Sequence, residues 1–546
     1  MDRLRLISFL ASVGLSLAGC GGGSSGPPPP PPPPPPNPIE KTTAYKFLNQ
    51  ATFGATEAEA ERLSSMGLEA WTDDQLRQPA SLQLPYLRSL PLPQFQPELQ
   101  LDRLDIWYRN SLYGNDQLRQ RVAFALSEIL VVSQLGVLDE LPYALASYYD
   151  LLARNAFGNY RDLLEEVTLH PAMGVYLSML GNEKPDAALN IRPDENYARE
   201  LMQLFSIGLV QLNPDGSQVL DDQGIPEPTY NQAIIEGFAH VYTGWHFAGA
   251  ARFEEAAPNL INQAIAMQLY PAFHDTSEKL VLDGATIPSG QTGDQDLAAA
   301  LDNIFNHPNV GPFVAIRLIQ RLVTSNPSPG YIQRVASVFD DNGAGVRGDL
   351  GAVVKSLLLD DEARPAIPME LDGKIKEPLL RLTQLWRAYN ATSASGRFPF
   401  GIGAFFFGQG PLQSPSVFNF FSPFYAPPGE IRNSSLVAPE LGIATEFQNT
   451  MVTNYMFYQA LAFTSETPDL EPDTVFINND DEIAIADDTD ALVDMVAGKL
   501  LAGEISQTLS DEIKGMVNRI DTTEAAIRVG EVIYFIASSP EYAYQR

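Results

Sequence analysis

The sequence predicts a mostly α-helical protein, a large multi-helix globular domain with long loops and at most a small β-hairpin. From residue 39 onward, apolar residues recur at helical spacing along most of the chain. Alternating patterns typical of strands are few. With 45% apolar residues, the 546-residue chain can bury a large core, which excludes a wholly disordered or fibrous protein.

Residues 1–19 have the pattern of a secretion signal. Two arginines precede an apolar stretch that is too short to cross a bilayer comfortably. The stretch ends in Leu17-Ala-Gly-Cys20, which resembles the bacterial lipobox, where a signal peptidase cleaves before a cysteine that accepts a diacylglycerol. We therefore expect Cys20 to be lipidated and to hold the protein on the lipid bilayer. The alternative is an ordinary signal peptide with an incidental cysteine.

Residues 20–38 read as a linker. A Gly/Ser-rich stretch leads into ten consecutive prolines, Pro27 to Pro36, which form a stiff polyproline II rod of roughly 30 Å. Gly21, rather than Asp, follows the cysteine, which in a Gram-negative lipoprotein implies export to the outer membrane. The expected location is thus the bacterial cell envelope, at the outer membrane.

The remaining residues, 39–546, are predicted to form the helical region. Thr56 and Glu59 have the spacing of a capping box and predict a helix that stops near Gly67. Apolar residues at helical spacing predict further helices within 117–135, 197–208, 234–242, 311–323, 331–340, 349–360, 376–389, 441–463, 491–501 and 524–538.

One short segment favours β-structure. Within 213–230, the pairs Asp215-Gly216 and Gln223-Gly224 can turn a small hairpin. Acidic sequence containing glycine and proline then interrupts the helices between 250 and 300. It allows a boundary there between two lobes of the helical region.

The charge balance excludes a nucleic-acid partner. The chain has 67 acidic and 35 basic residues and a formal net charge of −32, whereas binding to phosphates needs clustered Lys and Arg. Its single cysteine excludes a disulfide framework and a site built from several thiolates. We expect neither a metal nor a cofactor.

Several segments together resemble the bacterial domain of unknown function 1800 family over about residues 43–546. The resemblance implies a large exported or envelope protein, often encoded beside proteins of the domain of unknown function 1501 family, which resemble phosphatases and sulfatases. Such a protein is the partner that the resemblance suggests, and no activity comes with it. The segments are AYKFLNQATFGATEAEAERL (44–63), QLRQRVAFALSEILVVS (117–133), DENYARELMQLFSIGL (194–209), YTGW (242–245), FHDTSEKLVLDG (273–284), HPNVGPFVAIRLIQRLV (307–323), KEPLLRL (376–382), PSVFNFFSP (415–423) and IYFIASSPEYAYQR (533–546).

A first group of candidate site residues lies near the start of a predicted helix. Glu195 and Arg199 are four residues apart and can pair, and Asn196 and Glu200 share a neighbouring face. In a cleft, Glu195, Asn196 and Arg199 would bind a ligand, together with Trp245, and Glu200 would be a catalytic carboxyl. The alternative is an ion-pair network that fixes helix packing.

A second group is centred on histidines. His240 follows Glu236 by one helical turn, and a ligand from His274 or Asp275 would complete a metal site. Because HExxH is absent and no histidine pair has ligand spacing on one helix, we do not expect a catalytic metal.

The stretch from His274 to Lys279 is the most polar of the matched segments. His274, Asp275 and Lys279 are candidates for general acid–base chemistry if their side chains meet. The structural alternative has Asp275 capping a turn and Lys279 bridging to an acidic helix.

Two further stretches have unusual composition. Residues 398–425 hold ten aromatics, which either fill gaps between helices or receive a sugar or a partner protein. The acidic run 471–490 is either a solvated loop or a loose calcium site.

These residues leave two classes of function. The first, which we favour, is an accessory or interaction protein anchored in the envelope, because no tight catalytic constellation is visible. The alternative is an extracellular hydrolase acting on a polymer, with carboxylates and histidines from 195–200, 240–246 and 274–279.

Overall fold

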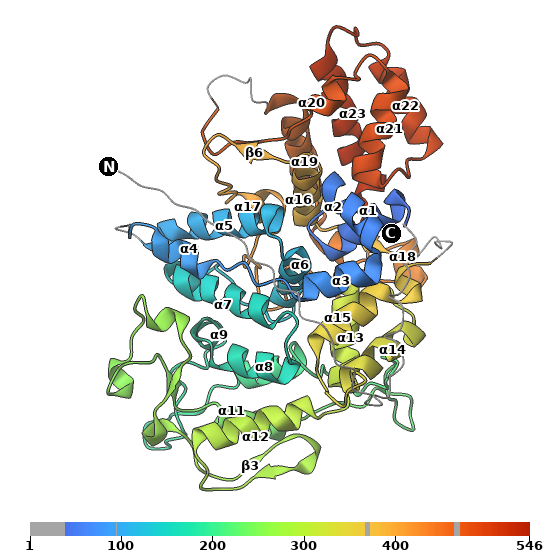
Figure 1. The fold of residues 1–546 in the computed structure, drawn as a ribbon. Coiled ribbons are helices and arrows are strands. Elements are labelled where there is room, and N and C mark those ends of the chain that lie inside the picture. Colours follow the sequence, from blue (N-terminus) through green and yellow to red (C-terminus); the bar gives the residue numbers. More distant parts are fainter. Residues whose placement is uncertain (1–38, 94–95, 366–371, 464–469, 546) are drawn as a thin grey trace, which may run out of the picture. The chain divides into compact units, whose positions relative to one another are not determined.

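The computed structural model describes residues 39–93, 96–365, 372–463 and 470–545 (Figure 1). Residues 38–546 form one compact unit. The described part is mostly helical, as predicted, and its β-structure consists of short antiparallel pairs. None of its helices is long and apolar enough to cross a membrane. The predicted signal peptide, Cys20 and the linker up to residue 38 lie outside the described residues.

The helices of the first half are joined by connections that range from a single residue to long loops. They are α1 (Lys41–Ala51), α2 (Glu57–Met66), α3 (Leu68–Leu76), α4 (Leu84–Ser89), α5 (Leu99–Tyr113), α6 (Gln117–Ser127), α7 (Pro142–Asn155), α8 (Tyr160–Leu169), α9 (Pro171–Tyr176), α10 (Asn196–Gln203), α11 (Gln232–Val241) and α12 (Gly293–Phe305).

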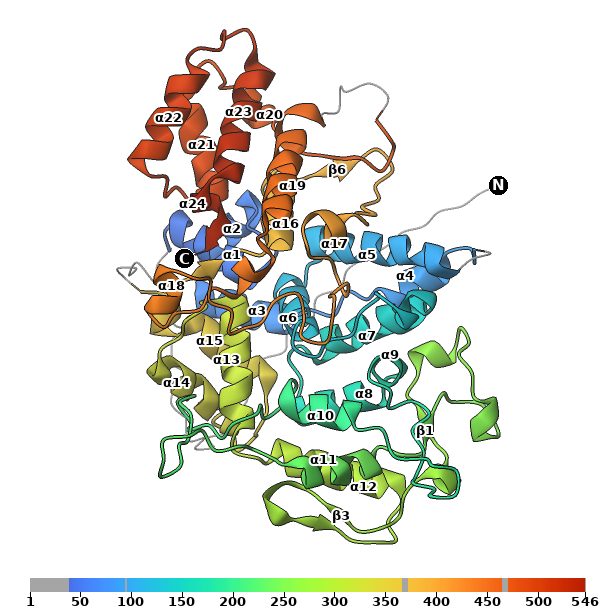
Figure 2. The ribbon, with the colours of Figure 1, turned by 180° about the vertical axis from the view of Figure 1, so that it is seen from behind.

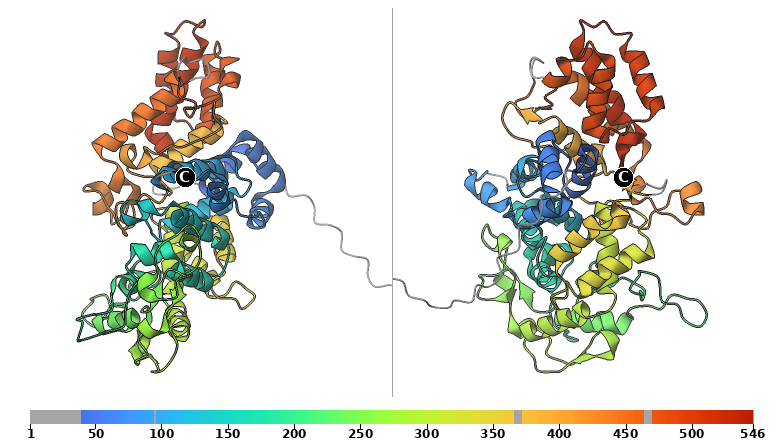
Figure 3. Two further views of the ribbon diagram at one scale, coloured as in Figure 1. Left: turned by 90° about the vertical axis from the view of Figure 1, so that its left-hand side faces the viewer. Right: turned by 45° about the vertical axis from the view of Figure 1, so that its right-hand side comes forward.

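The second half continues in the same way. Its helices are α13 (Val310–Leu322), α14 (Pro329–Asp340), α15 (Leu350–Leu359), α16 (Pro378–Ala388), α17 (Gly403–Phe406), α18 (Glu430–Asn433), α19 (Glu446–Phe457), α20 (Asp480–Ile483), α21 (Thr489–Leu501), α22 (Gln507–Val517), α23 (Ala525–Ser538) and α24 (Pro540–Ala543). Figure 3 shows α21, α22 and α23 packed side by side.

Half of the capping box predicted for α2 is recorded. The Thr56 side chain accepts a hydrogen bond from the Glu59 backbone N–H at 3.2 Å, and the helix ends at Gly67, whose φ of 84° favours glycine. The Glu59 carboxylate accepts from the Trp71 indole N–H at 2.9 Å. The residue predicted to complete the cap therefore also ties α2 to α3.

Helix α6 lies at the centre of the core. All of its residues are buried, and it contacts α3, α5, α7 and α13. Its buried residues include Arg119, which donates to the carbonyl oxygens of Gln78 and Ala153, and Arg121, which donates to that of Arg321 at 2.7 Å. The core thus contains guanidinium groups that act as hydrogen-bond donors to the ends of other helices.

The strands form four antiparallel pairs of two residues each within the described residues. They are β1 (Trp245–His246) with β2 (Gln268–Leu269), β3 (Lys279–Leu280) with β4 (Thr286–Ile287), β5 (Lys374–Ile375) with β8 (Tyr544–Gln545), and β6 (Thr392–Ser393) with β7 (Val475–Phe476).

The β5–β8 pair joins distant parts of the chain. Lys374 lies opposite Gln545 in the ladder, and the Gln545 side chain donates to the Leu322 carbonyl oxygen at 2.9 Å, at the end of α13. Both paired side chains are buried. Residues 544–545 therefore help to form the wall of the core around Lys374.

The segment 213–230, predicted to form a small hairpin, contains two successive turns. Bridges pair Leu212 with Gln218 and Leu220 with Pro226, and the turns contain Gly216 and Gly224, both at φ 78°. Asn309 fixes the base of this segment, since its side chain donates to the Ile207 and Val210 carbonyl oxygens, both at 2.8 Å.

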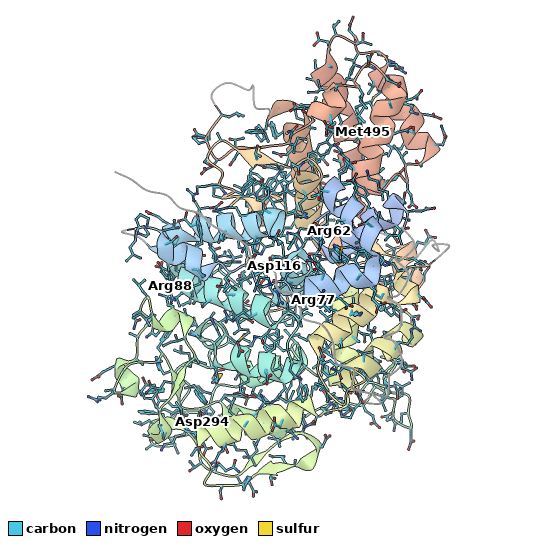
Figure 4. The ribbon with its side chains drawn as sticks, in the orientation of Figure 1. Arg62, Arg77, Arg88, Asp116, Asp294 and Met495 are labelled. Atoms are coloured by element: carbon cyan, nitrogen blue, oxygen red, sulfur yellow. The ribbon has the colours of Figure 1, made fainter. Side chains whose placement is uncertain are left out.

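Helix α11 packs on β3 at very short range. A Cβ atom on Gly237 would lie 1.8 Å from the Leu280 carbonyl oxygen, so only glycine allows this contact. Helix α11 also contacts α12, which begins with a capping box between Thr292 and Gln295. Asp294, labelled in Figure 4, lies in the first turn of α12 with Asp296.

Candidate functional site

The polar segment around residue 274 forms a buried cluster with α12. His274 Nε2 lies 2.9 Å from Asp296 Oδ2, and Lys279 Nζ lies 2.7 Å from the same oxygen. The three side chains are at most 1% exposed. Lys279 thus bridges to an acidic helix start, which is the geometry of the structural alternative, and the charges compensate one another out of contact with solvent.

Asp275 points to a different partner. Its carboxylate accepts from the Ser277 backbone N–H at 2.9 Å and forms a short hydrogen bond with His240 Nδ1. Burial acts to raise the pKa of Asp275, but the hydrogen bonds from His240 and Ser277 outweigh it and hold that pKa below its ordinary value. Asp275 therefore caps a turn and orients His240, whose side chain is 30% exposed.

The residues at the start of α10 lie on another helix. Arg199 pairs with Glu195 at 3.0 Å, and Glu195 also accepts from Gln232 of α11. Asn196 is exposed. Glu200 is buried, its Oε2 has no hydrogen-bond partner among the described residues, and burial raises its pKa.

Trp245 lies in β1, where its side chain is buried and its indole nitrogen has no hydrogen-bond partner among the described residues. The structure thus brings His240 close to Asp275 and His274 close to Lys279, but it records no contact between these residues and Glu200. The described side chains contain no cluster of three or more His, Cys, Asp or Glu residues suited to a metal ion. The catalytic and binding roles of these residues stay predictions.

A cavity of about 500 Å³ lies elsewhere, between α13, the segment that follows α10, and the aromatic segment near residue 420. Gln203 at the end of α10 and Phe313 on α13 both line it, and both helices are labelled in Figure 2. The lining is mainly apolar, and its charged residues are Glu128, Arg317 and Arg321. An apolar cavity with a few convergent polar groups is the usual form of a ligand site.

One face of α13 supplies both arginines. Phe313, Arg317 and Arg321 recur every four residues and therefore lie on the same side of the helix. The Arg317 guanidinium lies 5.1 Å from the ring centre of Phe313 and 4.7 Å from that of Phe424. The Arg321 guanidinium lies 4.6 Å from the ring centre of Phe421. These are cation–π distances, so the aromatic segment is fixed against α13 by its rings.

The aromatic segment itself is only partly a filler. Phe407 and Phe421 are buried, whereas Phe418 and Phe424 are 56% and 67% exposed and line the cavity. Some rings of this stretch therefore fill gaps between helices, as one expectation had it, whereas the binding of a sugar or a partner protein by the exposed rings stays a prediction.

Glu128 connects the cavity to a buried ionic cluster. Its Oε2 lies 3.4 Å from Arg321 Nη1, and its Oε1 accepts from Gln409 at 3.2 Å. The same Gln409 amide donates to Glu377 at 2.5 Å. Lys374 completes the cluster, because its Nζ lies 3.3 Å from Glu377 and 3.0 Å from Glu440.

The two linked carboxyls have opposite tendencies. Burial raises the pKa of Glu128, and the nearby carboxylate of Glu377 raises it further although Arg321 opposes this. Burial also acts to raise the pKa of Glu377, but Lys374, Arg321 and Arg121 outweigh it and lower the pKa. Glu128 therefore holds a proton that Glu377 gives up.

The sequence did not single out Glu128, Arg317 or Arg321. A usable signal exists, since Arg121 and Glu128 are seven residues apart and lie on the same face of an otherwise apolar stretch. Arg121 and Glu128 lie in the segment 117–133, and Arg317 and Arg321 lie in 307–323. Both segments are among those that carry the family resemblance.

Comparison with known proteins gives one match. The sequence profile of a family described as "Protein of unknown function (DUF1800)" matches residues 46–544. Neither a curated protein nor a solved structure matches significantly.

Proposed function

Since the chain belongs to the DUF1800 family of proteins of unknown function, whose description names no activity, we propose a function from its own residues. We propose that it is a lipoprotein of the bacterial envelope, anchored through Cys20 at the outer membrane, and that it acts by binding rather than by catalysis. The anchor rests on the lipobox-like sequence Leu17-Ala-Gly-Cys20 and the proline-rich linker that follows it.

One observation supports the binding role above all. The side chains best suited to acid–base chemistry are occupied with one another, since His274 and Lys279 share the carboxylate of Asp296 out of contact with solvent. A general acid or base must reach the substrate's proton directly or through one water. The open, apolar cavity is instead shaped for a ligand.

The anchor is tested by Cys20→Ser in cells that export the protein. We expect the wild-type chain in the membrane fraction and the variant in the soluble periplasmic fraction, with label from radioactive palmitate only in the wild type. Ser16→Ala, inside the same signal, is the matched control and should leave the protein on the membrane. A membrane-bound Cys20→Ser variant would overturn the anchor but would leave the binding role standing.

We propose as partner an exported phosphatase- or sulfatase-like protein of the domain of unknown function 1501 family. The test mixes the two purified proteins and measures mass by light scattering during gel filtration. A complex of fixed stoichiometry supports the proposal. Separate elution at micromolar concentration of both proteins contradicts it.

A hydrolase is the second candidate, favoured by Glu200, a buried carboxyl with a raised pKa and an oxygen that has no hydrogen-bond partner among the described residues. Its test is hydrolysis of extracellular polysaccharide and peptide by the wild type and by Glu200→Gln. Turnover by the wild type that the variant loses, at unchanged melting temperature, would establish it in place of the binding role.

A further inference from the structure

We infer that the cavity lined by α13, the segment after α10 and the aromatic segment binds a small apolar molecule carrying one carboxylate, with Arg317 as the partner of that carboxylate. This inference goes beyond the proposed function, because it assigns a site and a class of ligand. It stands whether or not the protein is anchored through Cys20.

The shape and lining of the cavity define the apolar part of the ligand. Its volume of about 500 Å³ lies within the range of small-molecule sites. The walls include Leu204, Ile207, Phe313, Ile316 and Val417. Removing an alkyl chain or ring from water and placing it against these side chains is favourable in proportion to the apolar area buried.

Arg317 supplies the charge that selects a carboxylate. The side chain is half-buried, and its one recorded hydrogen bond is to the amide oxygen of Gln320, at 3.2 Å. In the described part of the chain it has no carboxylate partner, whereas Arg161 and Arg199, which are buried to a similar degree, pair with Glu165 and Glu195. Burial lowers the pKa of Arg317 to about 9, and the neighbouring Arg321 adds to this effect, so an anion beside Arg317 would stabilise its charged form.

The neighbouring charges indicate a single negative charge on the ligand. Arg321 already lies against the Glu128–Glu377 pair, in which Glu377 carries the negative charge, so Arg317 is the remaining cation of the cavity lining. A planar guanidinium matches the two oxygens of a carboxylate. A dianion such as a phosphate monoester would leave one charge uncompensated in an apolar site.

The site is open at one edge. Phe418 and Phe424 are more than half exposed there, so a ligand can enter the cavity at this edge. The hairpin segment, which also lines the cavity, is fixed in place: Asn309 holds its base, and a Cβ on Gly216 would lie 2.9 Å from Ile316. The cavity is therefore formed without the ligand, which reduces the entropy lost on binding.

The test measures binding of three probes to the purified soluble chain by calorimetry: decanoate, the neutral analogue decanol, and decyl phosphate. We expect decanoate to bind one-to-one and at least about tenfold more tightly than decanol, the gain of a charge-assisted hydrogen bond, and more tightly than decyl phosphate. Equal affinity for decanoate and decanol, tighter binding of decyl phosphate, or no binding of decanoate would each overturn the inference.

Two variants locate the carboxylate. Arg317→Met should bind decanol as the wild type does and lose the tenfold preference for decanoate. Arg334→Met is the matched control, because Arg334 is an exposed arginine on α14 that pairs with Asp360 at 2.7 Å, and it should keep the preference. Retained decanol binding shows that the Arg317→Met site is folded. A decanoate preference that survives Arg317→Met would overturn the assignment.

Discussion

The ammonium group of Lys279 and the carboxylate of Asp296 lie 2.7 Å apart, and neither side chain is more than 1% exposed. They connect strand β3 to the first turn of α12. His274 contacts the same oxygen at 2.9 Å, so one carboxylate serves two basic side chains. The cluster therefore acts as an internal clamp between elements, and its members are expected to contribute to stability.

The first prediction concerns this clamp. Asp296→Asn should destabilise the fold by about 3–5 kcal/mol, because it leaves Lys279 buried without a counter-charge. Asp275→Asn should cost only about 1–2 kcal/mol, since its partner His240 is in contact with water. Urea unfolding followed by circular dichroism measures both. Equal losses in the two variants would contradict the clamp.

The second prediction concerns the proton held by Glu128. Because its pKa is raised in the folded chain, the unfolded chain binds fewer protons above the ordinary glutamate range. The contribution of Glu128 to stability is thus fully present at and below that range, and falls as the pH rises toward the raised pKa. Glu128→Gln, neutral at every pH, should match the wild type near pH 5 and exceed its stability near pH 9.

The comparison variant for Glu128 is Glu377→Gln. Glu377 is the carboxyl that stays charged, so its removal leaves Lys374 with Glu440 alone and should destabilise the fold by about 3–5 kcal/mol at neutral pH. Unfolding free energies from pH 5 to pH 9 test the pair. If Glu128→Gln lost more stability than Glu377→Gln at pH 8, the assignment of the proton would be wrong.

The third prediction compares two buried lysines. Lys374 neutralises Glu377 and Glu440, so Lys374→Met should cost about 3–5 kcal/mol. Burial keeps the pKa of Lys376 well below its ordinary value, and among the described residues its Nζ donates to the Gln384 side chain alone, at 2.6 Å. Lys376→Met keeps the length and the contact with the ring of Tyr542 and should cost about 1 kcal/mol or less. Melting curves of both variants at pH 7 should show a much larger loss of stability for Lys374→Met than for Lys376→Met.

The fourth prediction concerns two helical glycines. Gly237→Ala should destabilise the protein by about 1–3 kcal/mol or more, because the added Cβ would meet the Leu280 carbonyl oxygen and push β3 away from α11. Gly498→Ala on α21 meets no atom within 4 Å and should stabilise by about 0.5–1 kcal/mol through helix propensity. Chemical unfolding of the two variants should show opposite signs.

The helices were predictable where a long apolar face repeats. The expected helix within 311–323 is α13, Val310–Leu322, and the one within 524–538 is α23, Ala525–Ser538. Local chemistry was equally informative at the Thr56 cap and at the Gly216 and Gly224 turns. Each of these features is determined by residues close together in the sequence, so it can be predicted without the tertiary structure.

The buried ionic cluster could not be predicted in this way. Glu128, Arg321, Glu377 and Glu440 come from segments far apart, and although the apolar stretch around Glu128 hints that it is buried, no local pattern shows that the four side chains meet. Only the tertiary fold shows that α6 is buried on every face. The empty partner position of Arg317 has the same origin, because the lack of a nearby carboxylate is a property of the assembled cavity.

The pairing of β5 with β8 has a consequence for how the chain reaches its final state. Lys374 and Ile375 find their ladder partners only in Gln545 and Tyr544, and Gln545 also closes the end of α13. During synthesis the core around Lys374 can therefore be completed only after residues 544–545 have been made, because these contacts join residues far apart in the sequence.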